Sequence, residues 1–119
     1  RKLCPKCRKE RPFTEEEKAI INKIADKYNV KFDVDNHTTF DPVGCEYCNN
    51  SGFYDRIAIF ETLLFDDDIK ELIVKDASTL EIRDEALKHG YKPLLIDGIA
   101  KVVEGITTLE ELNRKLLFY

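Results

Sequence analysis

Two short stretches, Cys4-Pro5-Lys6-Cys7 and Cys45-Glu46-Tyr47-Cys48, contain all four cysteines of the 119-residue chain and share one C-x-x-C spacing. Two residues between the thiols let both sulfurs of a stretch bind one small cation, and two such stretches complete a tetrahedron of thiolates. The pattern predicts a zinc site with the ligands Cys4, Cys7, Cys45 and Cys48. Because protein sulfurs fill all four positions, none is left for water or substrate, so the predicted site is structural rather than catalytic.

Three other kinds of cysteine chemistry share parts of this pattern. Disulfides are typical of secreted chains, whereas the first residues here do not read as a signal peptide and the thiols keep metal-site spacing. A redox-active C-x-x-C normally occurs once, beside a βαβ pattern, and that context is absent. Iron in a rubredoxin-like site uses the same four sulfurs, so ligand type alone does not separate iron from zinc.

Length and composition favour one modest domain or two very small ones, too short for a complete nucleotide-hydrolysing enzyme. Hydrophobic residues make up 43% of the chain and charged residues 35%, which suits a soluble, helix-rich protein. No apolar run approaches membrane-spanning length. The formal net charge is −4, and four thiolates with one Zn²⁺ bring it to about −6, which does not favour a generic nucleic-acid binder.

Basic residues crowd around the first cysteine pair: Arg1, Lys2, Lys6, Arg8, Lys9 and Arg11. We expect them to offset the negative charge of the metal–thiolate centre and to lie in solvent. The alternative is a phosphate-binding patch, but no aromatic residues alternate with them, as a platform for single-stranded nucleic acid needs. Pro5 and Pro12 indicate a tight loop rather than a helix in this segment.

Between the cysteine pairs the sequence predicts one amphipathic helix. Thr14-Glu15-Glu16-Glu17 is a capping box, and the apolar residues after it recur at helical spacing on one face. Residues 30–34 alternate with period two, which predicts a short strand. His37 lies in the turn-rich approach to the second pair, and since four cysteines already fill the tetrahedron we interpret it as a loop histidine.

After the second cysteine pair, residues 56–65 are rich in β-branched and aromatic side chains, which predicts a strand that needs neighbours in a sheet. From Asp66 onward the sequence predicts an array of short helices. Acidic residues, capping boxes or a proline mark their starts: Asp66 to Asp68, Ser78-Thr79-Leu80-Glu81, Pro93, and Thr107-Thr108-Leu109-Glu110. Gly90 and Gly105 are placed to end two of them.

The predicted fold class is α+β and mostly α. Residues 1–55 are expected to form a small tetracysteine zinc module with one inserted amphipathic helix. Residues 56–119 are expected to form a strand followed by a helical subdomain. The chain lacks the phosphate-binding, dinucleotide and zinc-protease motifs, and His89, just before Gly90, suits a helix end better than catalysis. We therefore predict no catalytic residues.

The order of these motifs resembles the C-terminal part of the secretion ATPases that drive type II secretion and type IV pilus assembly. Matching segments run through nearly the whole chain, at residues 1–7, 44–53, 56–61, 76–78, 97–98 and 104–111. In that family the four cysteines bind zinc, which agrees with the ligands predicted above. Where the family usually reads Gly-Tyr-x-Gly-Arg-x-Gly-Ile, this chain has Asp55 and Ala58 in place of the second and third glycines.

The resemblance implies a cytoplasmic hexamer, peripheral to the inner membrane, whose P-loop, magnesium-binding and arginine-finger residues lie N-terminal to the tetracysteine motif. None of these is in this chain, so we expect ATP and Mg²⁺ to bind only in the parent protein and no catalysis by this part alone. The implied role is to transmit ATP-driven movement to neighbouring ATPase subunits or to the inner-membrane platform protein. No nucleic acid and no direct membrane insertion are expected.

Two other functions remain open from the residues. One is a free-standing zinc-ribbon-like module that binds nucleic acid or protein through its basic first loop. The other is a rubredoxin-like electron carrier, which would absorb visible light, whereas zinc with its filled d shell would not. A strand followed by G-x-x-x-x-G-K-[ST] upstream in the parent gene would favour the ATPase over both.

Overall fold

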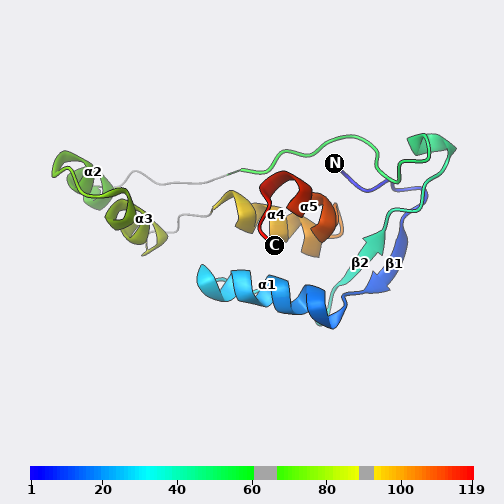
Figure 1. Cartoon of the computed structure of the whole chain (residues 1–119), viewed down its shortest axis with the longest axis horizontal. Coiled ribbons are helices and arrows are strands. Elements are labelled where there is room, and N and C mark those ends of the chain that lie inside the picture. The colour runs from blue at the N-terminus through cyan, green and yellow to red at the C-terminus, as the bar shows by residue number, and fades with distance from the viewer. Residues whose placement is uncertain (61–66, 89–92) are drawn as a thin grey trace.

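The structure is a computed structural model that describes residues 1–60, 67–88 and 93–119 (Figure 1). Its elements in chain order are β1 (Lys9–Pro12), α1 (Glu15–Lys27), β2 (Thr38–Asp41), the 3-10 helix η1 (Glu46–Cys48), α2 (Asp67–Val74), α3 (Thr79–Lys88), α4 (Leu94–Val103) and α5 (Leu109–Leu116). Helices dominate and the strands form one small sheet, so the predicted α+β, mostly α class is confirmed.

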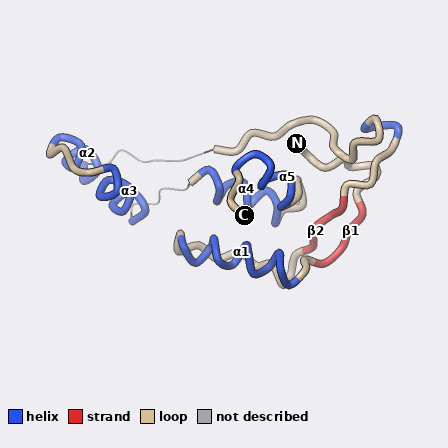
Figure 2. Tube along the Cα trace, in the orientation of Figure 1, coloured by secondary structure: helices blue, strands red, loops and turns tan. Residues whose placement is uncertain are grey.

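Strands β1 and β2 pair antiparallel, with Lys9 opposite Asp41 and Pro12 opposite Thr38 (Figure 2). The strand predicted at residues 30–34 is wrong, because this segment has no ladder partner and is irregular. Its alternation instead buries Val34 in the core and half-buries Phe32 against the same cluster. The two observed strands are each four residues long. One precedes α1 in the sequence and the other follows it, and they pair with each other. No local sequence pattern indicates this pairing.

Helix α1 begins as predicted. The Glu17 N–H donates to Thr14 Oγ1 over 3.1 Å, and the Thr14 N–H donates to Glu17 Oε1 over 2.9 Å, which completes the capping box. On its apolar face, Ile21 and Ala25 are buried. The helix is followed by Asn29 in the left-handed region at φ +55°, a conformation that asparagine tolerates.

The core lies where α1 packs beneath α4 and α5 (Figure 1). Its buried members are Phe13, Ile21, Val34, Ile99, Val102, Val103, Leu109 and Leu112. These residues come from both sides of residue 55, where the sequence places a boundary between two parts. The predicted division into residues 1–55 and 56–119 stays a prediction. The shared core holds α1 against the terminal helices.

The α4–α5 pair confirms one predicted start and shifts the other. Helix α4 begins directly after Pro93, and Gly105, at φ +82°, follows its end. The cap of α5 is Thr108 rather than the predicted Thr107, because the Glu111 N–H donates to Thr108 Oγ1 over 3.0 Å. The Thr107 hydroxyl instead donates to the Arg1 carbonyl over 2.7 Å.

The strand predicted at residues 56–65 is not present where the structure describes it. Residues 56–60 have no regular secondary structure and no strand partner, and residues 61–65 lie outside the described part. Ile57 and Ile59 are half-buried, whereas Phe60 is 66% exposed. The alternation suits a sheet edge, and within the described residues no neighbouring strand is there to pair with it.

Helices α2 and α3 pack on each other and stand apart from the other helices (Figure 1). The predicted cap of α3 is confirmed, since the Glu81 N–H donates to Ser78 Oγ over 3.2 Å. The predicted start of α2 at Asp66, and the helix-ending pair His89 and Gly90, fall outside the described residues. No helix in the described ranges has the length and apolarity to cross a bilayer.

Candidate metal centre

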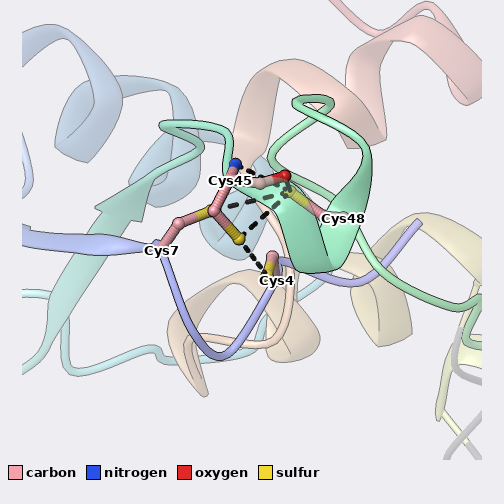
Figure 3. Close-up of side chains that lie close together, drawn as sticks. All are labelled: Cys4, Cys7, Cys45 and Cys48. Carbon is pink, nitrogen blue, oxygen red and sulfur yellow. Dashed lines mark hydrogen bonds between the residues drawn. The ribbon is translucent and has the colours of Figure 1, made fainter.

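The four cysteines converge from two loops that are far apart in sequence (Figure 3). All four sulfurs lie within 4.8 Å of one another. The Sγ atoms of Cys4 and Cys45 are 3.7 Å apart, those of Cys7 and Cys48 are 3.8 Å apart, and those of Cys45 and Cys48 are 3.7 Å apart. A tetrahedron with metal–sulfur bonds of about 2.3 Å has edges of about 3.8 Å, so these three of its six edges match a tetrathiolate metal site.

These sulfur distances exclude the disulfide alternative in this structure. A disulfide bond joins two sulfurs at about 2.05 Å, much less than the separations of 3.7–3.8 Å seen here. All four cysteines are free. Cys4 and Cys48 are buried, while Cys7 and Cys45 are partly exposed. The arrangement is therefore suited to binding one cation with four thiolates.

Backbone pairing brings the two cysteine loops together. The Cys4 N–H donates to the Gly52 carbonyl over 2.9 Å, and the Tyr54 N–H donates to the Lys2 carbonyl over 2.9 Å. Buried Leu3 forms an antiparallel bridge with Phe53 between these two bonds. The segment before the first pair thus lies beside the segment after the second pair, which places both loops around one centre.

The loop after Cys45 folds tightly because several of its residues adopt left-handed conformations. Asn49 and Asn50 have φ of +54° and +61°, and Gly52 has φ of +81°. The Asn50 N–H donates to the Cys45 carbonyl over 2.7 Å, which closes the loop. A tight turn therefore follows the second cysteine pair, and it turns the chain back past the cluster.

Backbone N–H groups from this loop point at the sulfurs. The Gly44 N–H donates to Cys7 Sγ over 3.2 Å, and the N–H groups of Cys45 and Gly52 donate to Cys48 Sγ over 3.3 and 3.2 Å. Such donors stabilise negative charge on sulfur, as a metal-bound thiolate requires. The C-x-x-C spacing alone gives no sign of these bonds, although Gly44 and Gly52 flank the second pair in the sequence.

The pKa values of Cys7 and Cys48 move in opposite directions. Burial raises the pKa of the Cys7 thiol to about 11, and the Gly44 N–H only partly opposes this. Burial also disfavours the Cys48 thiolate, but the N–H groups of Cys45 and Gly52 outweigh it and lower its pKa to about 6. The N–H groups around Cys48 therefore favour its thiolate form.

The basic cluster does more than offset charge. Arg1 donates to both carboxylate oxygens of buried Glu111, over 2.9 and 3.1 Å, and stacks on the Phe53 ring at 4.4 Å. Arg11 bridges Glu17, at 2.7 and 3.1 Å, and Asp41, at 2.8 Å. These arginines join segments that are distant in sequence, so they do not form a free phosphate-binding patch.

Lys6 shows how structure supplies an aromatic partner that the sequence does not place nearby. Its ammonium lies 4.2 Å from the centre of the Tyr47 ring, and Tyr47 stacks on Tyr54 at 4.3 Å. This cation–π contact attracts the exposed Lys6 ammonium to the face of the ring. His37, by contrast, is exposed in the loop just before β2, where its Nδ1 lies 2.6 Å from the Asp33 carbonyl, so it is a loop histidine as interpreted.

Asp55 and Ala58, the two departures from the resembling family, have different conformations. Asp55 lies in the left-handed region at φ +73°, where glycine carries the least strain. Its Oδ1 accepts the Arg56 N–H over 2.9 Å, a local bond that helps an aspartate occupy this region. Ala58 is not among the described residues with positive φ. The local backbone thus keeps the glycine-like turn only at Asp55.

Comparison with known proteins places these features in a wider context. The family model described as "Type II/IV secretion system protein" matches residues 1–114. The type IV pilus assembly ATPase PilB of Myxococcus xanthus is 37% identical over 112 residues, which cover 93% of this chain and 19% of that protein. The type II secretion system protein E of Aeromonas hydrophila is 37% identical over 116 residues, covering 96% of this chain and 21% of that protein.

Proposed function

Because the chain belongs to the type II/IV secretion system protein family, we propose that it is the metal-stabilised C-terminal part of a hexameric secretion or pilus-assembly ATPase. The chain spans about a fifth of the length of the curated relatives it matches. In this proposal the ATP and Mg²⁺ sites belong to the rest of the protein. The part seen here passes ATP-driven movement to neighbouring subunits or to the inner-membrane platform protein, at the cytoplasmic side of that membrane.

The observation that carries the metal assignment is the convergence of four free thiols, all within 4.8 Å of one another and with three sulfur–sulfur distances of 3.7–3.8 Å. Cys4, Cys7, Cys45 and Cys48 would hold one Zn²⁺ as a structural ion. The bound ion would cross-link the two loops and leave no open coordination position. The N–H groups of Gly44, Cys45 and Gly52 are already placed to support the anionic sulfurs.

The contacts around the cluster support a mechanical role for the chain. The Leu3 N–H donates to the Ile106 carbonyl over 2.8 Å, and Arg1 binds Glu111 of α5. The first cysteine loop is therefore attached directly to the terminal helices. A module joined in this way moves as a unit when the rest of the protein moves, which is what transmission to a neighbour requires.

The zinc-ribbon alternative receives less support from the structure, because Arg1 and Arg11 are bound to carboxylates within the chain.

The electron-carrier alternative differs from the proposal in the visible absorption of the protein. We expect the purified protein to contain about one zinc per chain and to be colourless, since a ferric tetrathiolate absorbs visible light. Elemental analysis with an absorption spectrum measures both. A red protein with one iron per chain would favour the electron carrier.

A test in the full-length protein separates the structural role of the metal from nucleotide hydrolysis. We expect Cys45→Ser or Cys48→Ser to reduce secretion or pilus assembly more than basal ATP hydrolysis, because the site has no chemical role in hydrolysis. Some loss of hydrolysis is also expected, since residues 56–60 directly follow the second loop. The measurements are ATP turnover, hexamer formation and in-cell transport for the same variants. Full transport by a variant shown to be metal-free would overturn the mechanical role.

A further inference from the structure

Three segments meet beside the first cysteine pair. Arg8, the residue after Cys7, donates from Nη1 to the Gly105 carbonyl over 2.9 Å. Its guanidinium also lies 4.1 Å from the centre of the Phe40 ring. Phe40 belongs to β2, and Gly105 to the turn between α4 and α5. One side chain thus joins the cysteine loop, the sheet and the terminal helices, and we call Arg8, Phe40 and Gly105 the junction.

The junction is closely packed on its helical side. A Cβ atom added to Gly105 would lie 2.7 Å from the Phe40 ring, so the turn rests directly on the ring edge. Gly105 also has φ +82° and its N–H donates to the Val102 carbonyl over 3.0 Å, which ends α4. The position of the turn is therefore sensitive to the position of Phe40 and of the guanidinium stacked on it.

The junction is equally tied to the cysteine cluster. The Arg8 N–H donates to the Cys4 carbonyl over 3.2 Å, which closes the loop that carries Cys4 and Cys7. When both sulfurs are fixed by one ion, the backbone of Arg8 is fixed as well, because a single peptide bond separates it from Cys7. Loss of the ion frees this loop and, with it, the guanidinium.

We propose that Arg8 is a positioning residue that couples metal occupancy of the cysteine cluster to the order of the α4–α5 turn, an inference that rests on the metal binding proposed above. The coupling is reciprocal by thermodynamic linkage. If the bound metal stabilises the turn through Arg8, then removing the Arg8 contacts weakens metal binding by the same factor.

The test measures both sides of the linkage in the full chain. Zinc affinity is determined by competition with a chromophoric chelator, and hydrogen exchange of residues 103–112 is followed with and without zinc. In wild type we expect zinc to slow exchange in these residues. In Arg8→Ala we expect about tenfold weaker zinc affinity, within the usual range of coupling between two sites. We expect the response of the turn to become smaller without disappearing, because the Leu3 N–H still donates to the Ile106 carbonyl. Residues 45–52 should still respond to zinc in this variant.

Lys9→Ala is the matched control, since Lys9 is exposed and its side chain has no bonding partner among the residues that the structure describes. It should behave like wild type. Phe40→Leu is a second variant that keeps apolar volume but removes the ring, and it should reduce the response of the turn. Wild-type protein that binds no zinc would overturn both the metal site and the coupling. Zinc binding with an equal response of the turn in wild type and Arg8→Ala would overturn the coupling alone.

Discussion

Glu111 shows how a charged residue is kept in the interior of this small chain. Its side chain is 3% exposed, and it accepts hydrogen bonds from Arg1 and from Arg114 of its own helix. The hydrogen bond from Arg1 lowers the pKa of Glu111, although burial acts in the opposite direction. A buried carboxylate is tolerated only when it is paired in this way, so Glu111 fixes the first residues of the chain onto α5.

We expect Glu111→Gln to lower the free energy of unfolding by about 1.5–3 kcal/mol at pH 7, the usual value of a hydrogen bond to a charged group. The folded-state pKa of Glu111 is depressed, so its ionisation stabilises the fold above the unfolded carboxyl pKa of about 4.3. This stabilisation is lost as pH falls through the lower folded pKa. Urea unfolding of both proteins at pH 7 and in acid should therefore show a difference that shrinks in acid.

Glu110→Gln is the control for this prediction, because Glu110 is the adjacent residue of α5 and is exposed. It should cost little at either pH. An equal loss of stability in Glu110→Gln and Glu111→Gln would show that the general charge of the helix start, rather than the pair with Arg1, is responsible.

Asp55 and Ala58 offer a second test at single residues. We expect Asp55→Gly to be neutral or to stabilise the fold by up to about 1 kcal/mol, since glycine removes left-handed strain but also the bond to the Arg56 N–H. Ala58→Gly should destabilise by about 0.5–1 kcal/mol, because it only increases the freedom of the unfolded chain. Thermal unfolding of the two variants checks this, and a stabilising Ala58→Gly would contradict it.

Among the elements, α5 begins with two adjacent threonines that have different roles, one as the helix cap and the other in a tertiary contact. Both Thr107 and Thr108 satisfy the sequence pattern for a capping residue, with Glu110 and Glu111 three positions later. In the structure Thr108 is the capping residue, and the Thr107 hydroxyl donates a hydrogen bond to the Arg1 carbonyl. The choice places Leu109 and Leu112 in the core and Glu111 opposite Arg1.

We expect Thr108→Ala to destabilise the chain by about 1 kcal/mol through loss of the helix cap. Thr108→Ser should retain most of the stability, because a serine hydroxyl can accept the same N–H. Equilibrium denaturation of the two variants measures the difference. If Thr108→Ala unfolds like wild type, the capping bond from the Glu111 N–H does not matter for α5.

The whole molecule has two centres of order, the apolar core between α1 and the α4–α5 pair and the cluster of four cysteines. The first centre includes α1, so this helix does not depend on the cluster alone. The loops that carry the cysteines contain few buried apolar side chains, among them Leu3. A bound ion is therefore expected to supply much of their folding free energy, on the order of 10 kcal/mol in small metal-dependent domains.

We accordingly expect chelation of the metal to disorder the cysteine loops and the β1–β2 sheet, while the packing of α1 against α4 partly survives. Hydrogen exchange resolved by residue, with a metal assay on the same sample, distinguishes the two regions. The re-addition of zinc should restore protection. A chain that contains no metal and remains cooperatively folded throughout would contradict a structural role for the ion.

The sequence by itself determined the two cysteine pairs, the capping box of α1, the capping residue Ser78 of α3, the start of α4 and the family, because these depend on residue types at short spacing. The tertiary structure decided what local patterns cannot encode. Residues 30–34 and 56–60 have the alternating pattern of strands, but a strand forms only where the backbone of a second segment can hydrogen-bond to it. Among the described residues, β1 and β2 pair with each other. In the same way, the cap of α5 and the partners of Arg1, Arg8 and Arg11 were fixed by contacts between segments up to 110 positions apart. Burial and pairing at that range depend on the assembled core, so no window of sequence contains them.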